Sequence, residues 1–123
     1  MKSGYINLVD LDFEYKIWKN RLDLFRKEIK IILERKEEVK DEDTIDDLPS
    51  GEIERIDKHY QELTFLFNRI KVQEQELQFY NKDFPITPQH QFYTEQEQLR
   101  NMIGDLSKKH VEYMVFLMRR LSL

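Results

Sequence analysis

The sequence has no cysteine, and glycine and proline each occur only three times in 123 residues. Without cysteine the chain cannot form disulfide bonds, a thiolate zinc site or a cysteine nucleophile. Because the glycines are isolated, there is also no glycine-rich phosphate-binding loop and no G-x-S-x-G turn of the kind that holds a hydrolase serine. Few residues interrupt helices, so the composition favours long ones.

Long apolar runs are also absent. The longest, YMVFLM at 113–118, is far shorter than the ~20 residues that span a bilayer. The first residues lack the basic stretch followed by about 7–15 apolar residues that marks a secretory signal. We therefore expect a cytoplasmic protein without a membrane partner. Acidic residues outnumber basic ones by 24 to 20. Nucleic acid is not an expected partner either, because its binding depends on clustered Lys and Arg.

Only three histidines, His59, His90 and His110, are available as metal ligands or acid–base groups. A di-iron bundle needs Glu-x-x-His on two helices, whereas Ile56 and Ser107 stand three residues before His59 and His110. No H-E-x-x-H sequence occurs, and no nucleophile, base and orienting group can be assembled from the residues. We therefore expect no enzyme activity, no bound metal and no cofactor.

Charged residues make up 36% of the chain and hydrophobic residues 40%, and the apolar positions recur with a helical period. The pattern predicts helices over about 10–40, 52–82 and 88–121, with an acidic linker at 41–51 and a proline-containing linker at 83–88. Matched lengths and short linkers favour antiparallel neighbours. The predicted fold is all-α, with a single domain over 1–123. It is an antiparallel bundle of three long helices with coiled-coil-like heptad packing, which dimerisation could complete.

Each predicted helix repeats apolar residues at steps of three and four, the spacing of a buried heptad face. The first has Leu11, Tyr15, Trp18, Leu22, Phe25, Ile29, Ile32 and Val39, interrupted by Lys36. The second has Ile53, Ile56, Tyr60, Leu63, Phe67, Ile70 and Leu77, interrupted by Glu74. The third has Phe92, Gln96, Leu99, Ile103, Leu106, His110, Tyr113 and Leu117. We expect these residues to form the core, so that Phe67→Ala costs roughly 3–5 kcal/mol.

Three local features leave alternatives open. The third helix has two candidate start signals, Thr87 before Pro88 and the capping box of Thr94 with Glu97. Gly104 marks either a close helix contact or a bend. Glu74 either fixes the register between helices or marks a point where the core face opens.

The stretch DFEYKIWKNRLDLFRKEIKIILERKEEV at 12–39 resembles the opening helix of small, uncharacterised all-helical proteins of Bacteroidetes-type bacteria. The resemblance covers about a quarter of the chain, and the matching motif is an amphipathic helix. It implies a bacterial, cytosolic, helical protein, and it brings no catalytic residues and no activity.

Two rows of apolar residues lie outside the predicted core faces. With Tyr15 and Trp18 at heptad positions a and d, one row falls at position c, about 100° around the helix from d. This first stripe consists of Ile17, Leu24 and Ile31. The second stripe, nearly opposite the core face of its helix, consists of Phe65, Val72 and Phe79. A broad internal core explains the first stripe equally well, but it does not explain the second.

Exposed apolar rows of this kind mark interaction sites. The sequence therefore predicts a noncatalytic protein–protein interaction or self-assembly module, either a homodimer or a partner for another helical protein. Its associating residues would be Ile17, Leu24, Ile31, Phe65, Val72 and Phe79. The alternative is a bundle that binds a small ligand, haem or a metal in a core site near His110, where Tyr113 and Met114 also lie. If His110 has only a structural role, it is a hydrogen-bonded core histidine.

Overall fold

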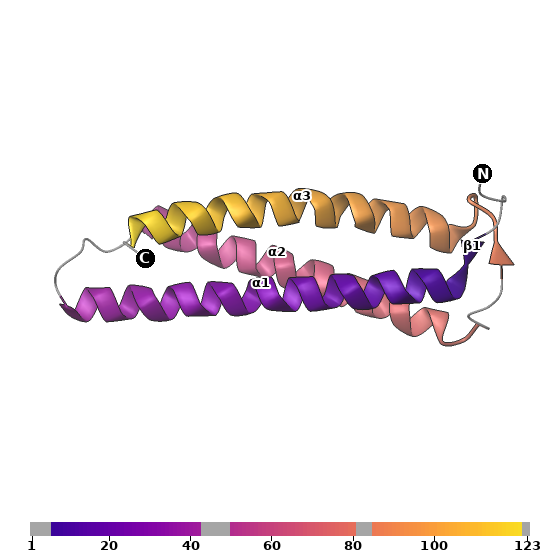
Figure 1. The fold of residues 1–123 in the computed structure, drawn as a ribbon, viewed down its shortest axis with the longest axis horizontal. Helices are drawn as coiled ribbons and strands as arrows, with labels where there is room; N and C mark the ends of the chain where they lie inside the picture. The colour runs from indigo at the N-terminus through magenta and orange to yellow at the C-terminus, as the bar shows by residue number, and fades with distance from the viewer. Residues whose placement is uncertain (1–5, 43–49, 81–84, 122–123) are drawn as a thin grey trace.

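The computed structural model describes residues 6–42, 50–80 and 85–121. Three long helices make up most of these residues: α1 (Leu8–Glu42), α2 (Ser50–Leu77) and α3 (Gln91–Arg120). Each helix packs against the other two, most extensively α1 against α2. Consecutive helices run in opposite directions, and the bundle is several times longer than it is wide (Figure 1). The predicted all-α class is confirmed, and the helix bounds lie near those expected.

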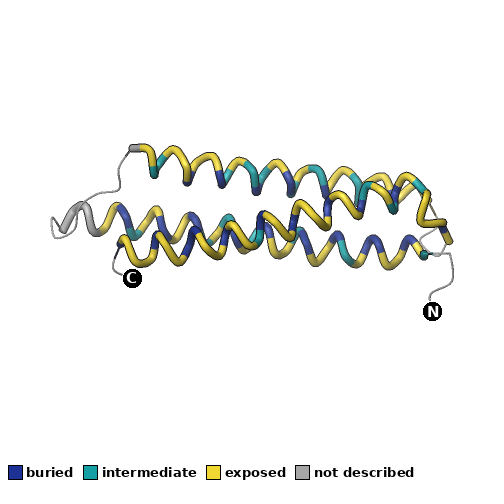
Figure 2. The backbone as a smooth tube through the Cα atoms, turned by 90° about the horizontal axis from the view of Figure 1, so that it is seen from above, coloured by how far each residue is buried: buried dark blue, intermediate teal, exposed yellow. Residues whose placement is uncertain are grey.

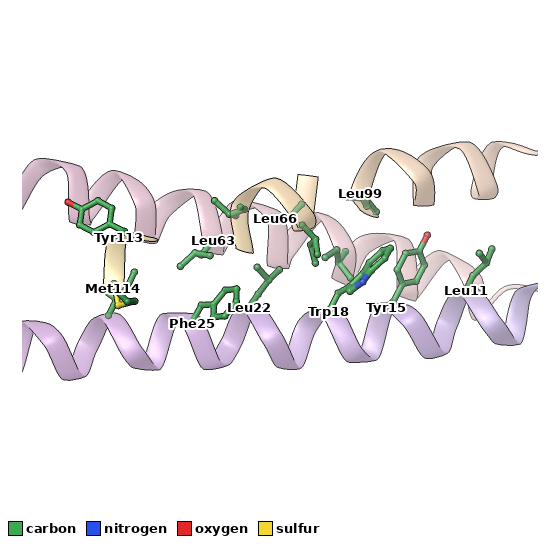
Figure 3. Close-up of a cluster of buried hydrophobic side chains, with 14 of the residues drawn as sticks. Leu11, Tyr15, Trp18, Leu22, Phe25, Leu63, Leu66, Leu99, Tyr113 and Met114 are labelled. Carbon is green, nitrogen blue, oxygen red and sulfur yellow. The ribbon is translucent and has the colours of Figure 1, made fainter. Parts of the chain in front are cut away.

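The buried face of α1 coincides with the predicted heptad positions. All seven apolar residues predicted between Leu11 and Ile32 are buried, and Lys36 is buried with them. Val39 lies among the residues whose side chains are not described. Figure 2 shows the buried positions recurring along the inner side of the helices. The side chains of Leu11, Tyr15, Trp18, Leu22 and Phe25 rise from α1 towards the other two helices (Figure 3).

The buried face of α2 differs from the prediction at every second step. Ile56, Leu63, Ile70 and Leu77 are buried as expected. The positions between them are occupied by His59 and Leu66, while Tyr60 and Phe67 lie only partly buried at the edge of the core. The assignment of Phe67 to the fully buried core was wrong. The buried face of α2 is turned towards His59 and Leu66, so the two aromatic residues fall at its margin. There the Arg26 guanidinium lies 4.4 Å from the centre of the Phe67 ring.

All eight predicted core positions of α3 are buried, together with Met114 and the following Leu121. The start of α3, however, uses neither predicted capping signal. The helix begins at Gln91, and His90 is its N-cap, with Nδ1 accepting a hydrogen bond from the backbone N–H of Phe92 at 3.2 Å. Thr94 lies inside the first turn, where its hydroxyl donates to the His90 carbonyl. A histidine acceptor two residues before a free N–H can therefore serve the purpose of Asn or Asp.

Two very short strands, which we did not predict, close one end of the bundle. β1 (Ile6–Asn7) pairs antiparallel with β2 (Pro85–Ile86), so that Ile6 faces Ile86 and Asn7 faces Pro85. Ile86 is buried. The pairing ties the chain just before α1 to the segment that precedes α3. Of the expected proline-containing linker, 83–84 lie outside the described residues, as do 43–49 of the acidic linker.

Helix α2 ends at Leu77 and not near residue 82. It is followed by a tighter turn in which the N–H groups of Gln78, Phe79 and Tyr80 each bond to the carbonyl three residues before. The Tyr80 ring packs edge-on against the Phe92 ring of α3, with 5.2 Å between centroids. This contact holds the turn against the start of α3, while Phe79 is exposed.

Glu74 connects two helices. Its carboxylate lies 2.5 Å from Nζ of Lys19 and 3.5 Å from Nζ of Lys16, both on α1. The Glu74 side chain is largely buried, so the two lysines compensate a charge that would be costly alone. This arrangement agrees with the alternative in which Glu74 fixes the register between helices.

None of the described helices is both long and apolar enough to cross a bilayer.

Gly104 does not mark a close helix contact. A Cβ atom added there would meet no other atom within 4 Å, and the residue is exposed within α3. We expect Gly104→Ala to raise the free energy of unfolding by about 0.5–1 kcal/mol, because alanine restricts the unfolded chain and favours the helix. Thermal unfolding followed by circular dichroism would measure this gain. An unchanged or lower melting temperature would indicate an unrecognised contact at this position.

Candidate functional sites

The most unusual feature of the interior is a pair of buried histidines joined to a carboxylate. His59 of α2 and His110 of α3 are each about 1% exposed. His59 Nε2 lies 2.9 Å from His110 Nδ1, and His110 Nε2 lies 2.8 Å from Glu28 Oε1 on α1. One hydrogen-bonded chain therefore links all three helices. The prediction that His110 is a hydrogen-bonded core histidine is correct.

Hydrogen bonding determines which ring nitrogens carry protons. Because Glu28 is half-exposed and can only accept when ionised, His110 Nε2–H donates to it. The Nδ1 atom of a neutral His110 is then an acceptor, so His59 Nε2–H must donate to it. This leaves Nδ1 of His59 as a bare acceptor, and within the described part of the chain it has no hydrogen-bond partner.

Aromatic rings enclose the pair. The Phe25 ring stacks on His110 at a centroid distance of 4.0 Å, and the Tyr113 ring lies 5.8 Å from that of His59. Tyr113 is itself anchored, because its hydroxyl donates to the Glu52 carbonyl at 3.1 Å. Apolar and aromatic surroundings disfavour a charged imidazole.

Both histidines are consequently harder to protonate than in water. Burial, followed by the proximity of His110 and Lys109, lowers the pKa of His59 from 6.5 to about 4. Burial also lowers the pKa of His110, although its hydrogen bond to Glu28 acts in the opposite direction. At neutral pH the pair is therefore uncharged.

The pair is not arranged as a metal centre. His59 and Glu28 lie on opposite ring nitrogens of His110 and do not converge on one point. Among the described residues, no group of three or more His, Asp or Glu side chains could hold a metal ion. A haem iron would have to displace one of the two hydrogen bonds of His110. The arrangement is suited to fixing the three helices relative to one another.

The role of His59 was missed at the sequence level. The spacing of His59 could have revealed its role. His59 stands three residues after Ile56 and four before Leu63, which is the spacing of buried positions on a heptad face. The neighbouring Tyr60 fits the same spacing and is more apolar, so the pattern favours it over His59.

The first stripe lies on the surface of the single chain. Ile17, Leu24 and Ile31 are 41%, 54% and 60% exposed. Ile17 and the neighbouring Phe13 line a groove between α1 and α3, whose opposite wall includes Tyr93 and Arg100. The internal core therefore does not account for this stripe.

The second stripe is also on the surface, but in a different place. Phe65, Val72 and Phe79 are 63%, 50% and 87% exposed. Phe65 lines an apolar groove between α2 and α3, together with Leu66, Met102 and Leu106. Ile17 of the first stripe and Phe65 of the second thus border two different grooves, which share no lining residue.

A third group of exposed apolar residues occurs near the end of α3. It comprises Val111, Val115, Phe116 and Met118.

No protein-family model, curated protein or solved structure matches this chain at a significant level.

Proposed function

We propose that the chain is a noncatalytic helical module that works by associating through its exposed apolar faces, most simply with a second copy of itself. The observation that carries this proposal is the position of the two stripes. All six of their residues are at least 41% exposed, while 22 other hydrophobic residues in the described part of the chain form the buried core. The stripes are therefore not needed to fill the interior.

The unfavourable free energy of exposing apolar rows to water supports the same conclusion. Single exposed apolar side chains are normal on protein surfaces, whereas rows along one helix face form patches that drive association. Burying one Phe, Leu or Ile side chain stabilises a complex by roughly 1.5–3 kcal/mol before the costs of association are subtracted. The heptad spacing of both stripes suits the side of a partner helix.

Sedimentation equilibrium of the untagged chain over a wide concentration range tests the proposal. We expect a mass near twice the 15.2 kDa of one chain. Replacing Phe65 and Phe79 by Glu should weaken this association while leaving the helix content nearly unchanged, because both residues are exposed. A strict monomer would contradict self-association, and unfolding of the double variant would mean that these residues contribute to the core.

A ligand-binding bundle with a site near His110 is the second candidate. The observation in its favour is Nδ1 of His59, a buried acceptor without a partner among the described residues. A metal analysis and an absorbance spectrum of the purified protein separate this candidate from the first. A stoichiometric metal or a haem Soret band would favour it, and their absence from a protein that forms dimers would favour the association module.

A further inference from the structure

We propose that the second stripe is the contact surface for a second copy of this chain, with the two α2 helices antiparallel and the two-fold axis at Val72. This inference rests on the proposed self-association and specifies its geometry. In an antiparallel pair of identical helices, a residue seven positions before the axis meets the one seven positions after it. Phe79 lies two residues past the end of α2, in the turn that continues the helix, so Phe65 of each copy lies opposite Phe79 of the other.

The polar residues beside the second stripe fit this pairing. With the axis at Val72, Arg69 meets Gln75 of the second copy and Asn68 meets Glu76. Neither pair brings like charges together. The Arg69 guanidinium is also held 2.7 Å from Glu95 of the same chain, which compensates its charge.

The same operation on the first stripe gives the opposite result. With an axis at Leu24, Ile17 would meet Ile31, but Arg21 would face Lys27 and Glu14 would face Glu34. Like charges placed opposite each other across an interface are unfavourable. The absence of like-charge contacts thus favours the second stripe for an antiparallel pair of copies.

The groove beside Phe65 can accommodate Phe79 of the second copy. Its volume is about 530 Å³, and its apolar lining comes from Phe65, Leu66, Met102 and Leu106. Phe79 is 87% exposed, the highest value among the large hydrophobic residues described. It lies in the turn held by the Tyr80–Phe92 contact, so a projecting aromatic anchor and a matching groove lie 14 positions apart on one chain. The two-fold operation joins them twice.

The absence of native cysteine permits a direct test by disulfide trapping. Val72→Cys places a thiol on the proposed axis, facing its own copy. Leu24→Cys is the matched control, because Leu24 and Val72 are exposed to nearly the same degree, 54% and 50%. Under mild oxidation at micromolar concentration, we expect Val72→Cys to give mostly covalent dimer on a non-reducing gel and Leu24→Cys to stay monomeric.

The other outcomes separate this inference from the proposed function. Trapping of Leu24→Cys alone would overturn the α2 pairing and leave self-association standing. Equal trapping of both variants would indicate random collision and overturn the α2 pairing as well. No trapping, with a wild-type dimer in sedimentation equilibrium, overturns only the geometry, whereas no trapping with a wild-type monomer overturns both proposals.

A second measurement concerns the anchor itself. Phe79→Ala removes two symmetric contacts from each dimer, so we expect the dimer dissociation constant to rise about tenfold or more. Phe13→Ala, at an exposed phenylalanine in the α1–α3 groove, should change it by less than about twofold. Equal effects of the two substitutions would overturn the role assigned to Phe79.

Discussion

Replacing Leu66 with alanine is expected to lower the free energy of unfolding by about 2–5 kcal/mol, the range found for leucine deletions in closely packed cores. Leu66 is 1% exposed and lies between the buried positions Leu63 and Ile70 of α2. Its side chain is part of the buried cluster that includes Leu22 of α1 and Leu99 of α3 (Figure 3). Truncation would leave a cavity at the centre of the bundle that its neighbours can fill only in part.

The matched control is Phe67→Ala, one residue further along. Phenylalanine is larger than leucine, so a buried Phe67 would lose more than Leu66. Because the Phe67 ring is only partly buried and lies beneath the Arg26 guanidinium, we expect it to lose less. Urea unfolding of both variants at one pH measures the order directly. A larger loss for Phe67→Ala would restore the sequence-based assignment of the α2 core face.

This pair of residues illustrates how far the sequence alone defines the fold. The buried faces of α1 and α3 could be predicted because each helix carries one row at steps of three and four that is longer than any other apolar row on it. On α2, two rows compete, and His59 in one row is matched by Tyr60 in the other. Hydropathy favours the tyrosine, whereas packing against two neighbouring helices buries the histidine. The local sequence pattern does not contain the hydrogen bond between His59 and His110, which forms only when the helices pack together.

The start of α3 and the two short strands could not be predicted from the sequence for a related reason. His90 is not among the residues that usually begin a helix, and its capping bond to Phe92 depends on the ring orientation. The pairing of Ile6 with Ile86 joins positions 80 residues apart, and two-residue strands have no periodicity to detect. The contact between His59 and His110 likewise spans 51 positions. By contrast, exposure of the second stripe could be inferred, since it depends only on the angle of the stripe to the core face, whereas a broad internal core remained an alternative for the first stripe.

Acidification is expected to destabilise the bundle as the pH falls from about 6.5 to about 4. The folded state lowers the pKa of His59 from 6.5 to about 4, so between these values the unfolded chain binds a proton that the folded chain does not. Stability is therefore full above about pH 6.5 and decreases as the pH falls. A difference of this size corresponds to roughly 3 kcal/mol at pH 4. The lowered pKa of His110 acts in the same direction.

The charged groups around the pair have opposing effects on its protonation. Glu28 of α1 favours the protonated pair, as does Glu62 of α2, while Lys109 of α3 opposes it and is itself 3.2 Å from Glu62. Arg55 of α2 lies 5.4 Å from the Tyr113 ring centre and adds further positive charge on this side. A proton on either histidine would also place an N–H on Nδ1 of His59, where it would be a buried donor with no acceptor among the residues that the structure describes.

Urea unfolding between pH 4 and 8 would measure the effect in the wild type and in a variant with both His59→Leu and His110→Leu. Leucine has no proton to gain and fills a similar space, and Glu28 remains half-exposed to water, so the variant should lose most of the acid sensitivity in this window. His90→Asn is the control, since asparagine preserves the helix cap and the buried pair remains intact. If wild type and double variant lose stability in parallel as the pH falls, the histidines are not the cause, and the ion pairs between helices would have to account for it. A difference confined to pH 4–6.5 would instead assign acid sensitivity to the one hydrogen-bonded chain that joins α1, α2 and α3.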